Sequence, residues 1–99
     1  VTIPKVIENA EHVYQMYTVT VESNLRNKLV TELNKLGVGA SVHFDPPVHK
    51  QEYYKDFEIR ESLENTELLS NSIVTLPMFS SITDEEIYYV VECLEKILK

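Results

Sequence analysis

The segment from residue 41 to residue 57 concentrates the side chains that could do chemistry. It places His43, Asp45 and His49 around two consecutive prolines. Imidazole and carboxylate groups are common ligands of zinc and iron, so these three side chains could hold a metal ion. Two histidines in one loop are more often hydrogen-bonding or surface residues, and His43 could simply bond to backbone at the end of a strand. The spacing therefore predicts a functional loop and leaves its chemistry open.

The prolines, Pro46 and Pro47, give this loop a stiff backbone. Proline has no amide N–H for a β ladder and holds its φ angle near −65°. A strand predicted over residues 38–44 must therefore end before them, with His43 at its end. A loop that is ordered in advance loses less entropy when it binds a ligand.

The other reactive residue types occupy positions that favour packing. Cys93 lies beside the apolar stripe of the last predicted helix, and no histidine is near it in sequence. This placement indicates a small buried hydrophobe and not a nucleophile. Among the tyrosines only Tyr54 is of interest, because it is close to the histidines. No lysine has the apolar surroundings or cationic neighbour that a Schiff-base lysine needs. We therefore predict no catalytic residue in this chain. Because paired loop histidines are more often hydrogen-bonding or surface residues, we also predict no bound metal.

Composition indicates one small acidic domain. The chain has 99 residues, 43% of them apolar, and 16 acidic against 9 basic residues give a net charge of −7. The basic residues are scattered, so nucleic acid is not an expected partner. There is no long apolar run or signal-peptide pattern, so no membrane association is expected either. A single cysteine favours a reducing, cytoplasmic setting.

Hydrophobic periodicity predicts the elements that must position the loop. A period of two predicts three strands, at residues 13–21, 38–44 and 73–76. Helical spacing predicts two long helices, at residues 24–36 and 84–98, and two short ones, at residues 50–57 and 66–71. The polar stretch 57–64 is expected to be a surface loop. This order favours a two-layer α/β or α+β domain, with helices packed on a small sheet.

Both long helices have recognisable ends. Ser23 or Asn24 can cap the first helix, and Gly37 supplies a left-handed stop after it. Thr83 and Glu86 have the spacing of a capping box at the start of the last helix. The acidic residues in that first turn also favour the positive end of the helix dipole.

The histidine loop and its neighbours resemble the DegT/DnrJ/StrS-type sugar aminotransferases. The run of His43-Phe44, Pro47, His49 and Tyr54 is similar to the histidine, aromatic, proline, histidine run in the small C-terminal domain of that family. Four further stretches are similar in the same order and spacing: Arg26 with residues 29–38, residues 63–71, residues 75–79 and residues 82–87. The resemblance as a whole covers about residues 12–96. Each stretch is weak alone, but motifs in register are a specific signal.

The resemblance implies a parent enzyme that uses pyridoxal phosphate. Such enzymes transfer an amino group, commonly from glutamate, to a nucleotide-linked keto sugar in amino-sugar and cell-surface polysaccharide biosynthesis. A separate large domain carries the Schiff-base lysine and most of the phosphate site. Residues 1–11 would then be a remnant of the inter-domain connection, and residues 12–99 the small domain with a three-stranded, largely antiparallel sheet. The full-length homodimer would hold the cofactor, while the isolated chain would bind none and be inactive.

The resemblance also implies that the small domain covers the cofactor cleft and contributes to the sugar-nucleotide site. The residues expected to contact the substrate are His43, Phe44, His49, Lys50 and Tyr54. Lys50 is the expected partner of the diphosphate, and no cofactor-binding residue is assigned. The sequence departs from the commoner family pattern at Asp45 and Glu52, where an uncharged residue is more usual. Negative charge beside a diphosphate is unfavourable, so the resemblance supports the domain more strongly than the individual substrate contacts.

Two other functions remain open from the residues alone. The first is a free-standing α/β module that binds or regulates through an acidic or phosphorylated ligand. The second is a small metal-binding protein built on His43, Asp45 and His49. The coding sequence upstream of Val1 would separate the first of these from a domain of a larger enzyme.

Overall fold

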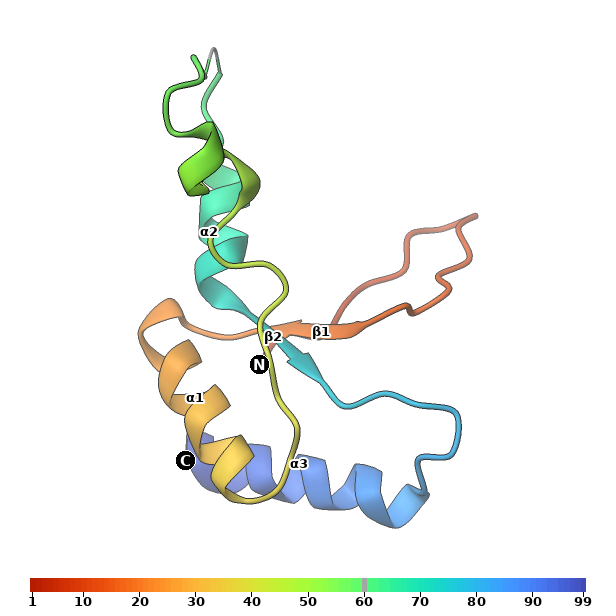
Figure 1. Cartoon of the computed structure of the whole chain (residues 1–99). Helices are drawn as coiled ribbons and strands as arrows, with labels where there is room; N and C mark the ends of the chain where they lie inside the picture. The colour runs from red at the N-terminus through yellow and green to blue at the C-terminus, as the bar shows by residue number, and fades with distance from the viewer. Residues whose placement is uncertain (60) are drawn as a thin grey trace.

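The computed structural model describes residues 1–59 and 61–99. Within these residues the chain is an α+β domain with three α-helices, two 3-10 turns and a two-stranded antiparallel sheet (Figure 1). In chain order the elements are β1 (Tyr17–Thr20), α1 (Ser23–Lys35), η1 (Val48–Lys50), η2 (Glu52–Tyr54), α2 (Glu64–Ser72), β2 (Ile73–Leu76) and α3 (Asp84–Leu98). The predicted class, helices packed on a small sheet, is therefore confirmed.

Of the three predicted strands, the one at residues 38–44 is not confirmed. Ser41 alone forms an isolated antiparallel bridge to Thr75, with N–H···O distances of 3.1 and 2.8 Å in the two directions. The backbone before it is used locally, because the Asn34 side-chain amide donates to the Ala40 carbonyl at 2.8 Å and the Ala40 N–H donates to the Val38 carbonyl. Backbone groups that bond within a turn cannot also form a ladder. The segment therefore crosses β2 without becoming a strand.

The first strand is shorter than predicted. β1 pairs with β2 in antiparallel register, with Val19 opposite Val74. The residue types alternate from position 13, but Tyr14 has a φ of 46° and its N–H donates to His12 Nδ1 at 2.8 Å. A positive φ is incompatible with an extended strand. The pairing consequently begins only at Tyr17, and Thr2 adds an isolated bridge to Thr20 on the other edge.

Helix α1 agrees with the prediction in length and in its end but not in its cap. Gly37 has a φ of 80°, the left-handed conformation expected after the helix. The N-cap is Glu22, and no side chain caps the helix, so the assignment of Ser23 or Asn24 as the cap is wrong. The buried residues recur at helical spacing and include a charged one: Arg26, Leu29 and Leu33. A cation on the core-facing side of α1 requires a partner.

The two short helices differ from the prediction, whereas the last helix and β2 have the predicted bounds. Residues 50–57 form parts of the turns η1 and η2 and no α-helix, and α2 begins before the predicted cap Thr66. No helix or strand occurs in the described part of the 57–63 loop, and Arg60 lies outside the described residues. The capping box of α3 is confirmed, since Glu86 N–H donates to Thr83 Oγ1 at 3.2 Å and Thr83 N–H donates to Glu86 Oε2 at 2.8 Å.

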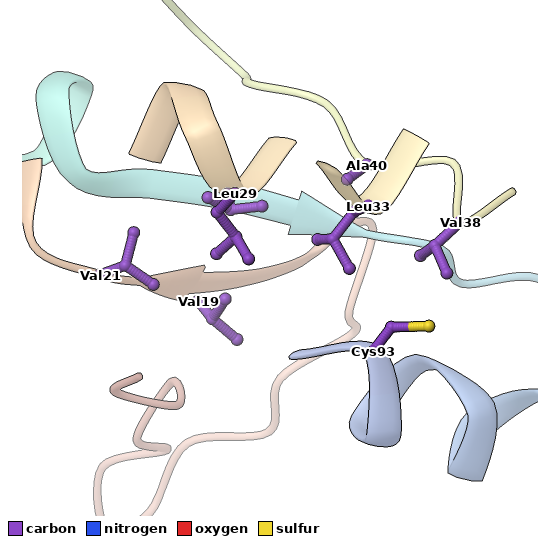
Figure 2. Close-up of a cluster of buried hydrophobic side chains, with 8 residues drawn as sticks. Val19, Val21, Leu29, Leu33, Val38, Ala40 and Cys93 are labelled. Atoms are coloured by element: carbon purple, nitrogen blue, oxygen red, sulfur yellow. The ribbon is translucent and has the colours of Figure 1, made fainter. Parts of the chain in front are cut away.

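The core lies between α1, the sheet and α3. Its buried apolar members are Val19, Val21, Leu29, Leu33, Val38, Ala40, Val74 and Cys93. Figure 2 shows Leu29 and Leu33 reaching from α1 toward the strands, with Cys93 on α3 across from them. Cys93 is buried and free, so the prediction that it packs as a small hydrophobe is confirmed. Leu29 and Leu33 of α1 and Cys93 of α3 thus belong to one hydrophobic core.

The chain exposes more surface than its mass requires. Its accessible surface is 7,872 Å², whereas a folded monomer of this mass exposes about 5,800 Å². Part of the excess is apolar and lies on α3, where Ile87 and Val91 are 45% and 46% exposed. Figure 1 also shows the segment before β1 extending away from the sheet. Among the described residues, no helix combines the length and apolar composition needed to cross a bilayer.

Candidate functional site

The histidine loop, residues 43–50, lies against α1 and α2. Figure 1 shows the chain running from the end of α1 across β2 to α2. The Arg26 guanidinium on α1 contacts the Asp45 carboxylate, with 2.6 Å between Nη2 and Oδ2. The Ser70 hydroxyl on α2 donates to the Phe44 carbonyl at 3.0 Å and lies 3.4 Å from Asp45 Oδ1. Both helices therefore hold the first half of the loop.

His43 is held against β2 by hydroxyl groups. Its Nδ1 lies 3.2 Å from Thr75 Oγ1 and 3.4 Å from Ser41 Oγ. Phe44 packs edge-on against the imidazole, with 5.4 Å between ring centroids, and is itself 67% exposed. The structure thus favours a hydrogen-bonded histidine at this position, bonded to side-chain hydroxyls and not to backbone.

His49 and Lys50 share one carboxylate on α2. His49 Nε2 lies 3.0 Å from Glu67 Oε1, and Lys50 Nζ lies 2.7 Å from Glu67 Oε2. The hydrogen bond from Lys50, and then the one from His49, lowers the pKa of Glu67 below its ordinary value of 4.5. The His49 side chain is only 12% exposed, whereas that of Lys50 is 50% exposed. Glu67 is consequently the counterion that fixes the second half of the loop.

This arrangement predicts a dependence on pH that is specific to Glu67. The pKa of Glu67 is lowered on folding. The stability that its ionised carboxylate adds to the fold is therefore fully present above the ordinary pKa of 4.5 and is lost as the pH falls through the lower pKa of the folded state. In NMR spectra recorded from pH 6 to pH 3, the Lys50 amide should therefore shift in this acidic range. The shift should vanish in Glu67→Gln and persist in Glu64→Gln, a change in the same helix. An unchanged transition in Glu67→Gln would contradict the assignment.

Tyr54 lies beside the second half of the loop. Together with His49 and Phe57 it lines a shallow hollow of about 410 Å³. Its ring is 37% exposed and packs edge-on against Tyr53 and Phe57, with 5.0 and 5.6 Å between centroids. The five residues expected at the substrate site therefore form two groups: His43 with Phe44 at β2, and His49, Lys50 and Tyr54 beside α2.

The geometry does not support the metal hypothesis. The three proposed ligands each have another partner: Asp45 the Arg26 guanidinium, His49 the Glu67 carboxylate, and His43 the Thr75 hydroxyl. Within residues 1–59 and 61–99, no three His, Cys, Asp or Glu side chains are placed to hold a metal ion. The loop histidines act here as hydrogen-bonding groups.

The residues of this chain also do not fit pyridoxal phosphate. Every lysine is exposed, and a Schiff-base lysine needs a desolvated or cationic environment to lower its pKa. A hollow of about 550 Å³ beside Gly37 and Gly39 is lined by Glu85 and Glu86 and not by cationic side chains. Two carboxylates repel a phosphate, so no step involving this cofactor is assigned to the chain.

Sequence reasoning did not assign a role to four residues that organise the loop. Arg26, Glu67, Ser70 and Thr75 appeared only within the family-like stretches, without a function. For Arg26 a signal was present, since it lies three residues before Leu29 and seven before Leu33, on the buried face of α1. The other three could not be found this way, because their partners are distant in sequence.

Comparison with known proteins gives a family match over nearly the whole chain. The model of the DegT/DnrJ/EryC1/StrS aminotransferase family matches residues 1–95. A solved DegT DnrJ EryC1 StrS aminotransferase from Brucella abortus is 20% identical with a TM-score of 0.85, and the match covers 96% of this chain and 25% of that one.

Two further solved structures are similar over almost the entire chain. DesV from S. venezuelae, in complex with a ketimine intermediate, is 21% identical with a TM-score of 0.87, covering 99% of this chain and 26% of that one. NtdA from Bacillus subtilis, with bound cofactor PMP, is 27% identical with a TM-score of 0.82, covering 98% and 22%. The chain therefore spans about a quarter of the length of the structures it matches.

Proposed function

Because the chain belongs to the DegT/DnrJ/EryC1/StrS aminotransferase family, we propose that it forms the C-terminal small domain of a pyridoxal-phosphate-dependent sugar aminotransferase. The parent enzyme transfers an amino group to a nucleotide-linked keto sugar. The supporting observation is a family match over residues 1–95 in a chain that spans only a quarter of its structural relatives. Residues 12–99 form the domain, and residues 1–11 belong to the inter-domain connection.

The partner of this domain is its own large cofactor-binding domain. The surface exposed beyond that of an ordinary monomer of this mass is about 2,000 Å², and a standard interface buries about 800 Å² on each partner. The exposed apolar residues Ile87 and Val91 on α3 belong to this excess. A large domain, and a second subunit of a homodimer, would cover such a surface.

The histidine loop contributes the sugar-nucleotide contacts. Phe44 and Lys50 are its most exposed substrate candidates, and ammonium and imidazole donors suit the oxygens of a diphosphate. The cofactor, held by the large domain, supplies the electron sink for amino transfer. The loop's own task is to bind and orient the nucleotide sugar and to exclude water. The buried, unpaired Cys93 is consistent with a cytoplasmic enzyme.

The experiment that tests this proposal compares the isolated chain with the protein encoded together with its upstream sequence. An upstream region of roughly 250 residues with a lysine for cofactor attachment is expected. The longer protein should develop an aldimine absorbance band with pyridoxal phosphate and aminate a keto sugar nucleotide; the isolated chain should do neither. A saturable band in the isolated chain, or a start codon beside Val1, would contradict the proposal, and the start codon would favour a free-standing binding module.

A further inference from the structure

We propose that Arg26, Asp45 and Ser70 form a lock that fixes the orientation of the histidine loop. Arg26 and Asp45 are then positioning residues for nucleotide-sugar binding, although neither contacts the substrate. The lock itself is inferred from contacts within this chain. Its role in nucleotide-sugar binding rests on the proposed function.

The burial of Arg26 is the first reason. Arg26 is 7% exposed and lies on the same face of α1 as Leu29 and Leu33. A buried guanidinium is tolerated only when a counter-charge and hydrogen-bond acceptors satisfy it. Asp45 supplies the charge at 2.6 Å, and the Asn71 carbonyl accepts from Nε at 3.4 Å. The Asp45 side chain, itself 36% exposed, is therefore held by a buried guanidinium.

Ser70 on α2 fixes the orientation of the loop backbone and of the Asp45 side chain. Its hydroxyl lies within hydrogen-bond distance of both the Phe44 carbonyl, at 3.0 Å, and Asp45 Oδ1, at 3.4 Å. Asp45 thus receives contacts from α1 on one oxygen and from α2 on the other. With the carbonyl of Phe44 and the side chain of Asp45 both engaged by the helices, the ring of Phe44 is left 67% exposed on the outside.

The loop is tied a second time beyond the prolines. Pro47 is buried, and His49 contacts Glu67 on α2 at 3.0 Å. A loop that is anchored on both sides of two prolines has few conformations left, so little entropy is lost when a ligand binds. The side of the loop that carries Phe44 and Lys50 is thereby preorganised.

The lock also explains how the charge of Asp45 is accommodated in this loop. A free carboxylate in this loop would repel a diphosphate. Here the charge of Asp45 is balanced by the Arg26 guanidinium and the carboxylate is turned toward the helices. Asp45 therefore acts within the domain and need not weaken the proposed substrate site.

Hydrogen exchange of the intact protein that contains this chain tests the lock. The amides of Ser41, Lys50 and Gln51 donate to backbone carbonyls on either side of the lock. In Asp45→Asn they should exchange about tenfold faster, since the buried Arg26 guanidinium loses its counter-charge, while the amides of α3 stay unchanged. The double variant Arg26→Met/Asp45→Asn leaves no unpaired buried charge, so it should fold and still show the fast loop exchange.

The matched control is Glu32→Gln, which removes the exposed ion pair between Glu32 and Lys35 on the same helix, 2.8 Å apart. It should leave loop exchange unchanged. Loop exchange in both lock variants that is no faster than in Glu32→Gln would overturn the lock, whatever the protein binds.

Affinity for uridine, thymidine and guanosine diphosphate separates the lock from the proposed function. The tightest-binding of the three should bind about tenfold more weakly to both lock variants and equally well to Glu32→Gln, if an ordered loop is needed for binding. Faster loop exchange with unchanged nucleotide affinity would establish the lock as a feature of the fold, and would overturn its role in positioning the substrate site.

Discussion

Leu29→Ala and Leu33→Ala are each expected to lower the free energy of unfolding by about 2.5–5 kcal/mol. Both side chains are 0% exposed and lie at the contact of α1 with the sheet and α3. Truncation removes buried apolar surface and leaves a cavity that a close-packed core fills only in part. A domain of this size has a total stability of about 5–15 kcal/mol, so either change removes a large fraction of it.

Urea unfolding followed by far-UV circular dichroism measures this loss through the transition midpoint. Leu68→Ala is the matched control, because Leu68 lies on α2 but is 65% exposed. It should change the free energy of unfolding by no more than about 0.5 kcal/mol. Equal losses for Leu29→Ala and Leu68→Ala would show that α1 is not packed on the sheet as described.

In the proposed full-length aminotransferase, Lys50→Met is expected to raise the KM for the proposed sugar-nucleotide substrate about tenfold, with kcat nearly unchanged. The Lys50 side chain is 50% exposed, so its ammonium can reach a diphosphate from its place beside Glu67. Loss of one charge-assisted hydrogen bond weakens binding by about this factor. A contact made equally in the ground state and the transition state affects KM and leaves kcat unchanged.

Steady-state kinetics with the sugar nucleotide varied provides the measurement. The control is Lys55→Met, which removes a lysine of the same segment that pairs with Glu52. This variant should retain the KM of the unaltered enzyme. If the two variants raised KM equally, the effect would be one of general charge, and the assignment of Lys50 to the diphosphate would fail.

The elements predicted well from sequence are those whose signals are local. Helix α3 has a capping box between Thr83 and Glu86, three residues apart, and α1 ends at a glycine with positive φ. β2 ends before Pro77, which has no N–H to donate to a ladder. In each case the determining contacts lie within a few residues, so the sequence alone contains them.

The elements predicted poorly depend on competition between local and distant partners. Alternating residues at 38–44 have the pattern of a strand, yet Asn34 at the end of α1 takes the Ala40 carbonyl and only Ser41 pairs with β2. On α3, Cys93, which was placed beside the apolar stripe, is in the core, whereas Ile87 is 45% exposed. Periodicity identifies an apolar face but does not say how much of it the rest of the chain covers.

The sequence by itself determined the family resemblance, the positions of the main helices and the choice of the histidine loop, because these follow from residue types at short spacing. Only the tertiary structure decided how the loop is oriented. Asp45 meets Arg26 from 19 residues away, and His49 meets Glu67 from 18 residues away. Such pairs form because packing beside the loop leaves the Arg26 and His49 side chains only 9% and 12% exposed. A polar group removed from water then needs the hydrogen-bond partner that the fold places next to it.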